Sequence, residues 1–222
     1  MRLALFGGTF DPIHCAHLRV ARAAADAFAL DRILFAPTGR QPLKSAPALA
    51  SFDDRLAMVT LALTHPCAAH PSPDPRLRVS SLDSPRPDGQ PNYTVDLLEE
   101  LARSMPQTEL FAIAGADSFL TLAQWRSPKL VLELAKWIVV SRPGLALNSD
   151  FLHRPEFASL ALTSQQRARI HLLPGFHEDI SATALRELLR AYADNAHADA
   201  SSEAQLPPAV ADYIREHHLY QP

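Results

Sequence analysis

Residues 3–17 read LALFGGTFDPIHCAH. The apolar run Leu3–Phe6 is typical of a short buried strand, and it leads directly into Gly7 and Gly8. A helical pattern follows over Ile13–Leu30, in which the apolar residues return every three or four positions. A buried strand, a glycine turn and a helix in this order predict the first unit of an α/β protein with a parallel sheet.

The rest of the chain repeats this alternation of strand and helix. Apolar runs predict further strands at Ile33–Ala36, Leu77–Ser80, Leu110–Ala114, Trp137–Val140 and Ile170–Leu173. Helical patterns predict helices over 51–64, with Ser51 as the N-cap, and over 94–104, 128–134, 181–192 and 207–217. We therefore expect an open, doubly wound parallel sheet with helices on both faces.

The domain organisation follows from the absence of a separating linker or an internal repeat. We expect one domain over residues 1–222, with a small helical subdomain from about residue 170 onward. The stretches 66–75 and 145–168 have no clear pattern and are interpreted as variable insertions.

The composition excludes several classes of protein. The net charge of −3 offers no basic surface for nonspecific binding to nucleic acid. No apolar run reaches the roughly 18 residues that cross a membrane, and the N-terminus lacks a signal-peptide pattern. The chain has 2 cysteines, which is too few for a disulfide framework. We therefore expect a soluble cytoplasmic protein that has neither nucleic acid nor membrane as a partner.

The glycine turn is a candidate anion site. Ligands of open α/β sheets bind beyond the carboxyl ends of the strands, and a helix N-terminus there favours negative charge. His14 and His17 are three residues apart, so both imidazoles can face one phosphate chain. The turn has neither the dinucleotide fingerprint nor the Walker sequence. The spacing alone also allows a surface pair of histidines or half of a metal site, although only Asp11 and Cys15 are nearby.

Residues 7–17, GGTFDPIHCAH, closely resemble the nucleotidyltransferase signature G-x-[FT]-D-x-x-H-x-G-H. The fuller form resembles the bacterial nicotinate mononucleotide adenylyltransferases. This resemblance implies a Rossmann-like fold and the transfer of an adenylyl group from ATP to nicotinate mononucleotide in NAD biosynthesis. Ala16 stands where the family has glycine. Its methyl group either meets the nucleotide and weakens ATP binding, or points sideways without effect.

A second motif lies near the end of the chain, at residues 180–186, ISATALR. Read from the residues alone, Ser181 caps a helix and Arg186 can reach a phosphate at the helix start, or the segment is an ordinary capped helix with a solvated arginine. It resembles the family's ATP-phosphate motif I-S-x-T-x-[IL]-R. The resemblance implies that Ser181, Thr183 and Arg186 hold the outer phosphates.

Further segments resemble the family and imply ligand contacts. Lys44, in the loop 37–50, would meet a phosphate, and this loop has the prolines and glycine of a semi-rigid flap. Tyr93 and Thr94 begin a helix that contacts the nicotinate ring. Trp125 would stack on that ring, and Asp117 would bind ribose hydroxyls. Each of these residues also has an ordinary structural explanation, as a loop lysine, a helix cap or a half-exposed tryptophan. For Arg142, which follows the fifth strand, bracing of its loop is an alternative to ligand contact.

The resemblance assigns the site residues to three sets. The catalytic residues are His14 and His17, with His17 acting in the transition state. The ATP-binding set is Gly7, Gly8, Thr9, Phe10, His14, His17, Gly115, Asp117, Ile180, Ser181, Thr183 and Arg186, and the substrate-binding set is Lys44, Tyr93, Thr94, Trp125 and Arg142. Mg²⁺ is expected to enter bound to the phosphates of the co-substrate ATP, with no metal site built by the protein.

Other functions remain open at this point. A phosphopantetheine adenylyltransferase or a cytidylyltransferase shares the first motif, and a related enzyme could prefer nicotinamide mononucleotide. Ala16 also allows a nucleotide-binding module without catalytic activity. A metal protein using His65, His70, His217 and His218 matches no standard ligand spacing. The sequence does not decide the oligomeric state, and a homo-oligomer is one of the open alternatives.

Overall fold

The computed structural model describes residues 1–43, 46–65, 67, 72–141, 147–148, 150–174, 182–193 and 205–221. A parallel sheet of six strands lies at its centre in the order β3-β2-β1-β4-β5-β6. The strands are β1 (Arg2–Gly8), β2 (Arg32–Pro37), β3 (Leu77–Val79), β4 (Glu109–Gly115), β5 (Lys136–Val140) and β6 (Ile170–Leu173). This confirms the predicted fold class and the existence of every predicted strand.

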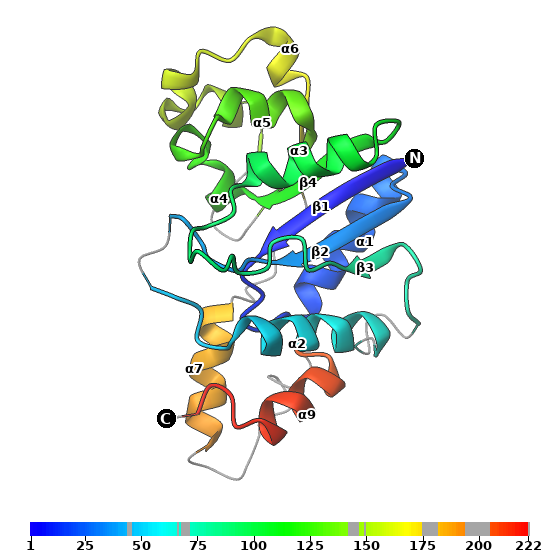
Figure 1. Cartoon of the computed structure of the whole chain (residues 1–222), viewed down its shortest axis with the longest axis vertical. Helices are drawn as coiled ribbons and strands as arrows, with labels where there is room; N and C mark the ends of the chain where they lie inside the picture. The colour runs from blue at the N-terminus through cyan, green and yellow to red at the C-terminus, as the bar shows by residue number, and fades with distance from the viewer. Residues whose placement is uncertain are drawn as a thin grey trace.

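Helices cover both faces of the sheet because the side chains of each strand alternate between them. In β1, Ala4 and Phe6 belong to one buried cluster, while Leu3 and Leu5 belong to the other. The first cluster includes residues of α1 (Cys15–Phe28), α2 (Phe52–Thr64), α7 (Ala182–Ala193) and α9 (Pro208–Glu216). The second includes residues of α3 (Thr94–Ser104), α4 (Ala116–Phe119) and α5 (Pro128–Leu134). Figure 1 shows the two groups of helices on opposite sides of the strands.

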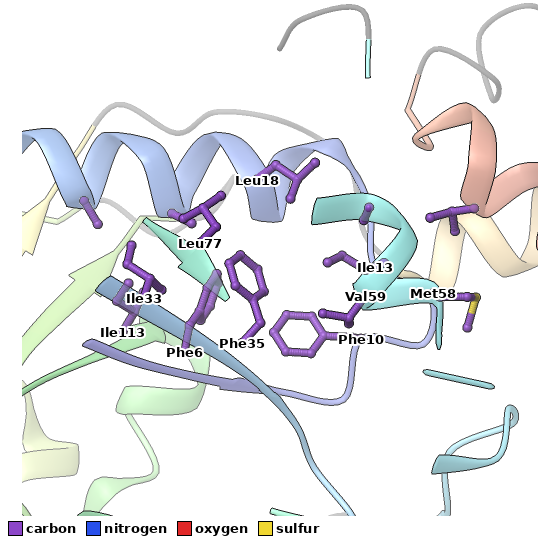
Figure 2. Packing of buried hydrophobic residues seen from close by; sticks show 14 of the residues in the cluster. Phe6, Phe10, Ile13, Leu18, Ile33, Phe35, Met58, Val59, Leu77 and Ile113 are labelled. Carbon is purple, nitrogen blue, oxygen red and sulfur yellow. The ribbon is translucent and has the colours of Figure 1, made fainter. Parts of the chain in front are cut away.

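Three phenylalanine rings pack against one another at the first turn, which follows β1. The rings of Phe6 and Phe35 lie 5.1 Å apart, and the ring of Phe10 lies 5.6 Å from each of them. Figure 2 shows these rings packed beside Val59 of α2. Phe10 has a φ of 47°, a left-handed conformation that costs energy in a bulky residue and that its buried ring compensates.

The helix boundaries agree with the sequence except at α1. The side chain of Ser51 accepts a hydrogen bond from the backbone of Asp54, so Ser51 is the predicted N-cap of α2. The prediction that α1 begins at Ile13 is wrong. His14 has an extended backbone with φ −144° and ψ 170°, and it serves as the N-cap, so that the first helical residue is Cys15. The chain needs the residues before His14 to turn from the strand into the helix.

The less regular C-terminal half contains short helices. The described part of 145–168 forms two 3₁₀ helices, Phe151–His153 and Pro155–Leu160, followed by α6 (Ser164–Arg167). A third 3₁₀ helix, Leu122–Gln124, follows α4. Residues of α7 and α9 share the buried cluster of β1, and the subdomain boundary near residue 170 stays a prediction. Among the described residues, no helix has the length and apolarity to span a membrane.

Candidate active site

The site lies at the carboxyl edge of the sheet, where β1 and β4 are neighbours. This is the point at which the strand order changes direction, and α/β sheets bind ligands in the crevice that forms there. Gly7 and Gly8 end β1, and Gly115 ends β4. A methyl group added at Gly7 would meet no atom within 4 Å, so space is open beside the turn.

The rings of His14 and His17 lie against each other at the start of α1, with His14 as its extended N-cap and His17 in its first turn. Their ring centroids are 3.8 Å apart, with His14 buried and His17 partly exposed. The backbone N–H of His14 donates to Nδ1 of His17 at 3.3 Å. Because Nδ1 accepts this hydrogen bond, the neutral form of the ring carries its proton on Nε2.

The two predicted motifs meet in space although they are far apart in the chain. Arg186 Nη1 donates to the backbone oxygen of Asp11 at 2.7 Å, and its Nη2 donates to Thr183 Oγ1 at 3.2 Å. Asp11 lies in the turn between β1 and His14, so α7 brings Arg186, with Thr183 bonded to it, to the turn that precedes the histidine pair. Phosphate binding by these residues stays a prediction.

Sequence reasoning did not predict the buried hydrogen bonds of Asp11 and Arg55, together called the hub, which hold this turn. Asp11 is 4% exposed, and its carboxylate accepts from the backbone N–H groups of Leu49 and Ala50, at 2.8 and 3.1 Å, and from Tyr220 Oη at 2.6 Å. Arg55, which is 2% exposed, donates to the backbone oxygens of Thr9, Thr38 and Ala50 at 2.8, 2.9 and 3.2 Å.

A signal for Arg55 was present in the sequence. The buried positions of α2 are Arg55, Met58, Val59 and Ala62, which have the spacing of one helix face. An arginine among these apolar positions is buried only when its donors are satisfied. This pattern could have identified Arg55, whereas its three acceptors come from three separate segments and could not be read from spacing.

Arg126 links the two segments that carry the predicted ring-binding residues. Tyr93 is the N-cap of α3, whose first residue is Thr94. The guanidinium of Arg126 lies over the Tyr93 ring, 4.9 Å from its centroid, which brings the segment after Trp125 to the start of α3. Trp125 Nε1 donates to Thr121 Oγ1 at 2.9 Å, and its ring packs edge-on against Trp137 at 5.3 Å. Stacking of Trp125 on a ligand stays a prediction.

The remaining predicted residues fall into two groups. Asp117 is exposed on α4, immediately after β4, and Ala16 is partly exposed in the first turn of α1. Thr9 is partly exposed in the turn, while Phe10 is buried below it. Four predicted residues, namely Lys44, Arg142, Ile180 and Ser181, lie outside the described residues.

Asp83 forms hydrogen bonds with two other segments, at Gly39 after β2 and at Asn92 just before α3. Its side chain, which is 5% exposed, accepts from Asn92 Nδ2 at 3.2 Å, and its backbone oxygen accepts from Gly39 at 2.8 Å. A side chain at Gly39 would place its Cβ 2.7 Å from that oxygen and from the nitrogen of Pro85, so this close approach requires glycine. Burial raises the pKa of the Asp83 carboxyl to about 6, although its hydrogen bonds act in the opposite direction and lower the pKa.

Asp83 therefore predicts a pH dependence of stability. The folded state favours the protonated carboxyl, so its contribution is fully present below the ordinary pKa of 3.8 and is lost as the pH rises through about 6. The difference corresponds to about 3 kcal/mol. Asp83→Asn, which cannot ionise, is expected to gain about this much relative to the original chain between pH 4 and pH 7. Urea unfolding of both proteins across this range measures it, and a difference that does not vary with pH would contradict it.

Comparisons with known proteins agree with this geometry. Residues 5–188 match the family model described as cytidylyltransferase-like, and the chain belongs to this class of nucleotidyltransferases. Within the class it belongs to the nicotinate-nucleotide adenylyltransferase family. A protein of Citrifermentans bemidjiense named "probable nicotinate-nucleotide adenylyltransferase" is 35% identical over 99% of this chain and 98% of its own length. A protein of Gloeobacter violaceus with the same name is 36% identical over 99% and 96%.

Solved structures show the same fold. The nicotinic acid mononucleotide adenylyltransferase of Plasmodium falciparum, complexed with NaAD, matches with a TM-score of 0.75. The match has 18% sequence identity and covers 99% of this chain and 97% of the Plasmodium chain. At this low identity the likeness supports the fold, while the family membership rests on the sequence relatives.

Proposed function

We propose that this chain transfers the adenylyl group of ATP to nicotinate mononucleotide, giving deamido-NAD and pyrophosphate in the biosynthesis of NAD. Its family supports this reaction. The observation that carries the proposal is the meeting of Arg186 and Thr183 with the turn that holds His14 and His17. Two groups of donors from opposite ends of the chain then surround one triphosphate.

Adenylyl transfer requires that the two reactants are held in position and that the developing negative charge is stabilised. The 5′-phosphate of the mononucleotide is already charged at neutral pH, so it needs no general base. One of its oxygens forms a bond to the α-phosphorus of ATP while the bond between that phosphorus and the bridging oxygen breaks, and pyrophosphate leaves. The Nε2 proton of His17 is directed to an α-phosphate oxygen, where it stabilises the charge that develops.

The other residues hold the reactants in line. The backbone of Gly8, Thr9 and Phe10 closes around the nucleotide, and His14 contacts the β-phosphate beside His17. Arg186 and Thr183 bind the outer phosphates. The segment from Tyr93 to Thr94 and the face of Trp125 hold the pyridine ring. Such alignment can supply several kcal/mol of the barrier reduction.

Mg²⁺ would be bound mainly by the phosphate oxygens of ATP, whose charge it would neutralise. Asp11 is the carboxylate beside the histidines, and its oxygens already accept from Leu49, Ala50 and Tyr220. Within the described part of the chain, no group of three or more His, Cys, Asp or Glu side chains could hold a metal ion. Because the Asp11 carboxylate is already engaged in these hydrogen bonds, we propose that the metal arrives with the nucleotide. We also propose the cytoplasm as its location, because 2 cysteines are too few for a disulfide framework.

Pyrophosphate release tests the proposal directly. The purified protein is incubated with ATP and Mg²⁺ and with one acceptor at a time: nicotinate mononucleotide, nicotinamide mononucleotide or phosphopantetheine. Fastest release with nicotinate mononucleotide, together with deamido-NAD as the product, is expected. Release only with phosphopantetheine would instead show another member of the superfamily. Release with none of the acceptors would contradict the proposed reaction and favour a nucleotide-binding module.

A further inference from the structure

The C-terminal segment reaches the catalytic turn through polar contacts. Tyr220 Oη donates to Asp11 Oδ1 at 2.6 Å, and the backbone N–H of Cys15 donates to the oxygen of Gln205 at 2.9 Å. Tyr220 also belongs to the buried cluster that contains Phe10. The residues on either side of His14 are therefore held by residues about 200 positions later in the chain.

The backbone of Tyr220 supports a specific role for its hydroxyl. Its φ is 62°, in the left-handed region that a bulky residue adopts only when its surroundings hold it there. The side chain is 7% exposed. Burial, followed by the charge of Asp11, raises the pKa of Tyr220 above its usual range, so the hydroxyl keeps its proton and remains a donor.

Asp11 connects Tyr220 to the turn that precedes the histidines. Among the described residues, its carboxylate accepts from two backbone N–H groups and from the phenol, and of these three donors the phenol alone can be removed by a substitution that leaves the main chain unchanged. Asp11 precedes His14 by three residues. Losing the phenol would remove the shorter of the two described hydrogen bonds to Oδ1, the other being that from the Ala50 N–H, and would allow the turn to shift. Misplacement by about 1 Å can cost about a hundredfold in rate.

We propose that Tyr220 is a positioning residue, which through Asp11 fixes the turn that presents His14 and His17 to the reacting phosphates. The inference deepens the proposed adenylyl transfer and rests on it. The ring of Tyr220 packs in the hydrophobic core, whereas its hydroxyl holds Asp11. A substitution can remove the hydroxyl and keep the ring.

Tyr220→Phe keeps the ring and removes the hydroxyl. Tyr213→Phe is its matched control, because Tyr213 Oη donates to Asp54 on α2 at 3.0 Å, away from the turn. Tyr220→Phe is expected to lower kcat about tenfold or more with little change in the KM for either substrate. Tyr213→Phe is expected to keep kcat within about twofold, at a similar loss of stability in urea.

A second measurement does not depend on turnover. Nitrogen NMR of labelled imidazoles is expected to show shifted His14 and His17 signals in Tyr220→Phe and unchanged ones in Tyr213→Phe. An active original protein whose Tyr220→Phe variant keeps its kcat and its imidazole signals would overturn the inference. Equal losses of kcat in both variants would also overturn it, because the hydroxyl would then act on stability alone. If the original protein transfers no adenylyl group, the proposed function fails while the imidazole signals still test the link.

Discussion

His17→Ala is expected to lower the kcat of adenylyl transfer by about a hundred- to a thousandfold, the loss typical when a donor to a developing negative charge is removed. Nδ1 of His17 accepts from the backbone of His14, and in the proposed mechanism its Nε2 donates to the reacting phosphate. Alanine removes this donor. The fold should persist because His17 is only partly buried.

Steady-state kinetics with ATP and nicotinate mononucleotide measure this effect. His153→Ala serves as the control, because His153 is exposed and lies in a 3₁₀ helix on the other helical layer. The control should keep its turnover, and both variants should unfold at nearly the same urea concentration as the original protein. Near-normal turnover of His17→Ala would remove His17 from the mechanism.

Arg55→Ala is expected to cost about 3–5 kcal/mol of the free energy of unfolding, as when a buried charge loses its partner. The guanidinium donates to the backbone oxygens of Thr9, Thr38 and Ala50, and the methyl group of alanine cannot replace these donors. The charge of Asp11 would also lose a compensating cation. The effect exceeds that of an ordinary core truncation because polar groups remain buried.

Denaturant unfolding measures the loss, and Arg103→Ala on the exposed surface of α3 is the matched control, with an expected change within about 0.5 kcal/mol. Arg55→Ala should also lower adenylyl transfer at temperatures where it stays folded, because Thr9 belongs to the catalytic turn. A loss of stability below about 1 kcal/mol would show that water replaces the guanidinium, and the proposed hub would then be wrong.

The fold could be predicted from the sequence because its signals are local. Buried parallel strands are short apolar runs, and such runs identified all six strands with ends within two residues. The start of α1 was predicted wrongly because Ile13 continues the apolar helical pattern. Periodicity reports which residues are apolar, whereas the backbone conformation of His14 depends on how the turn leaves β1.

The site could be predicted only in part. The pairing of His14 with His17 depends on a spacing of three residues, and that local contact is present. The contact of Arg186 with Asp11 joins two motifs by way of the whole fold, and only the resemblance to a known family suggested that they meet. Tyr220 and Arg55 had no such guide to their partners. Their hydrogen bonds end on backbone atoms or on a carboxylate far away in the chain, which no pattern of residue types reveals.

The hydrogen bond between Asp11 and Tyr220 joins residues 209 positions apart, and this separation determines when during synthesis the contact can form. A ribosome releases the first strand and helix early, so β1 and α1 can begin to pack while the rest of the chain is still being translated. The turn between them gains its phenol donor only after residue 220 has emerged. Nascent chains that stop short of this residue would therefore carry both histidines on a folded sheet and still lack the contact that aligns them. Activity would arise as one of the last events of synthesis.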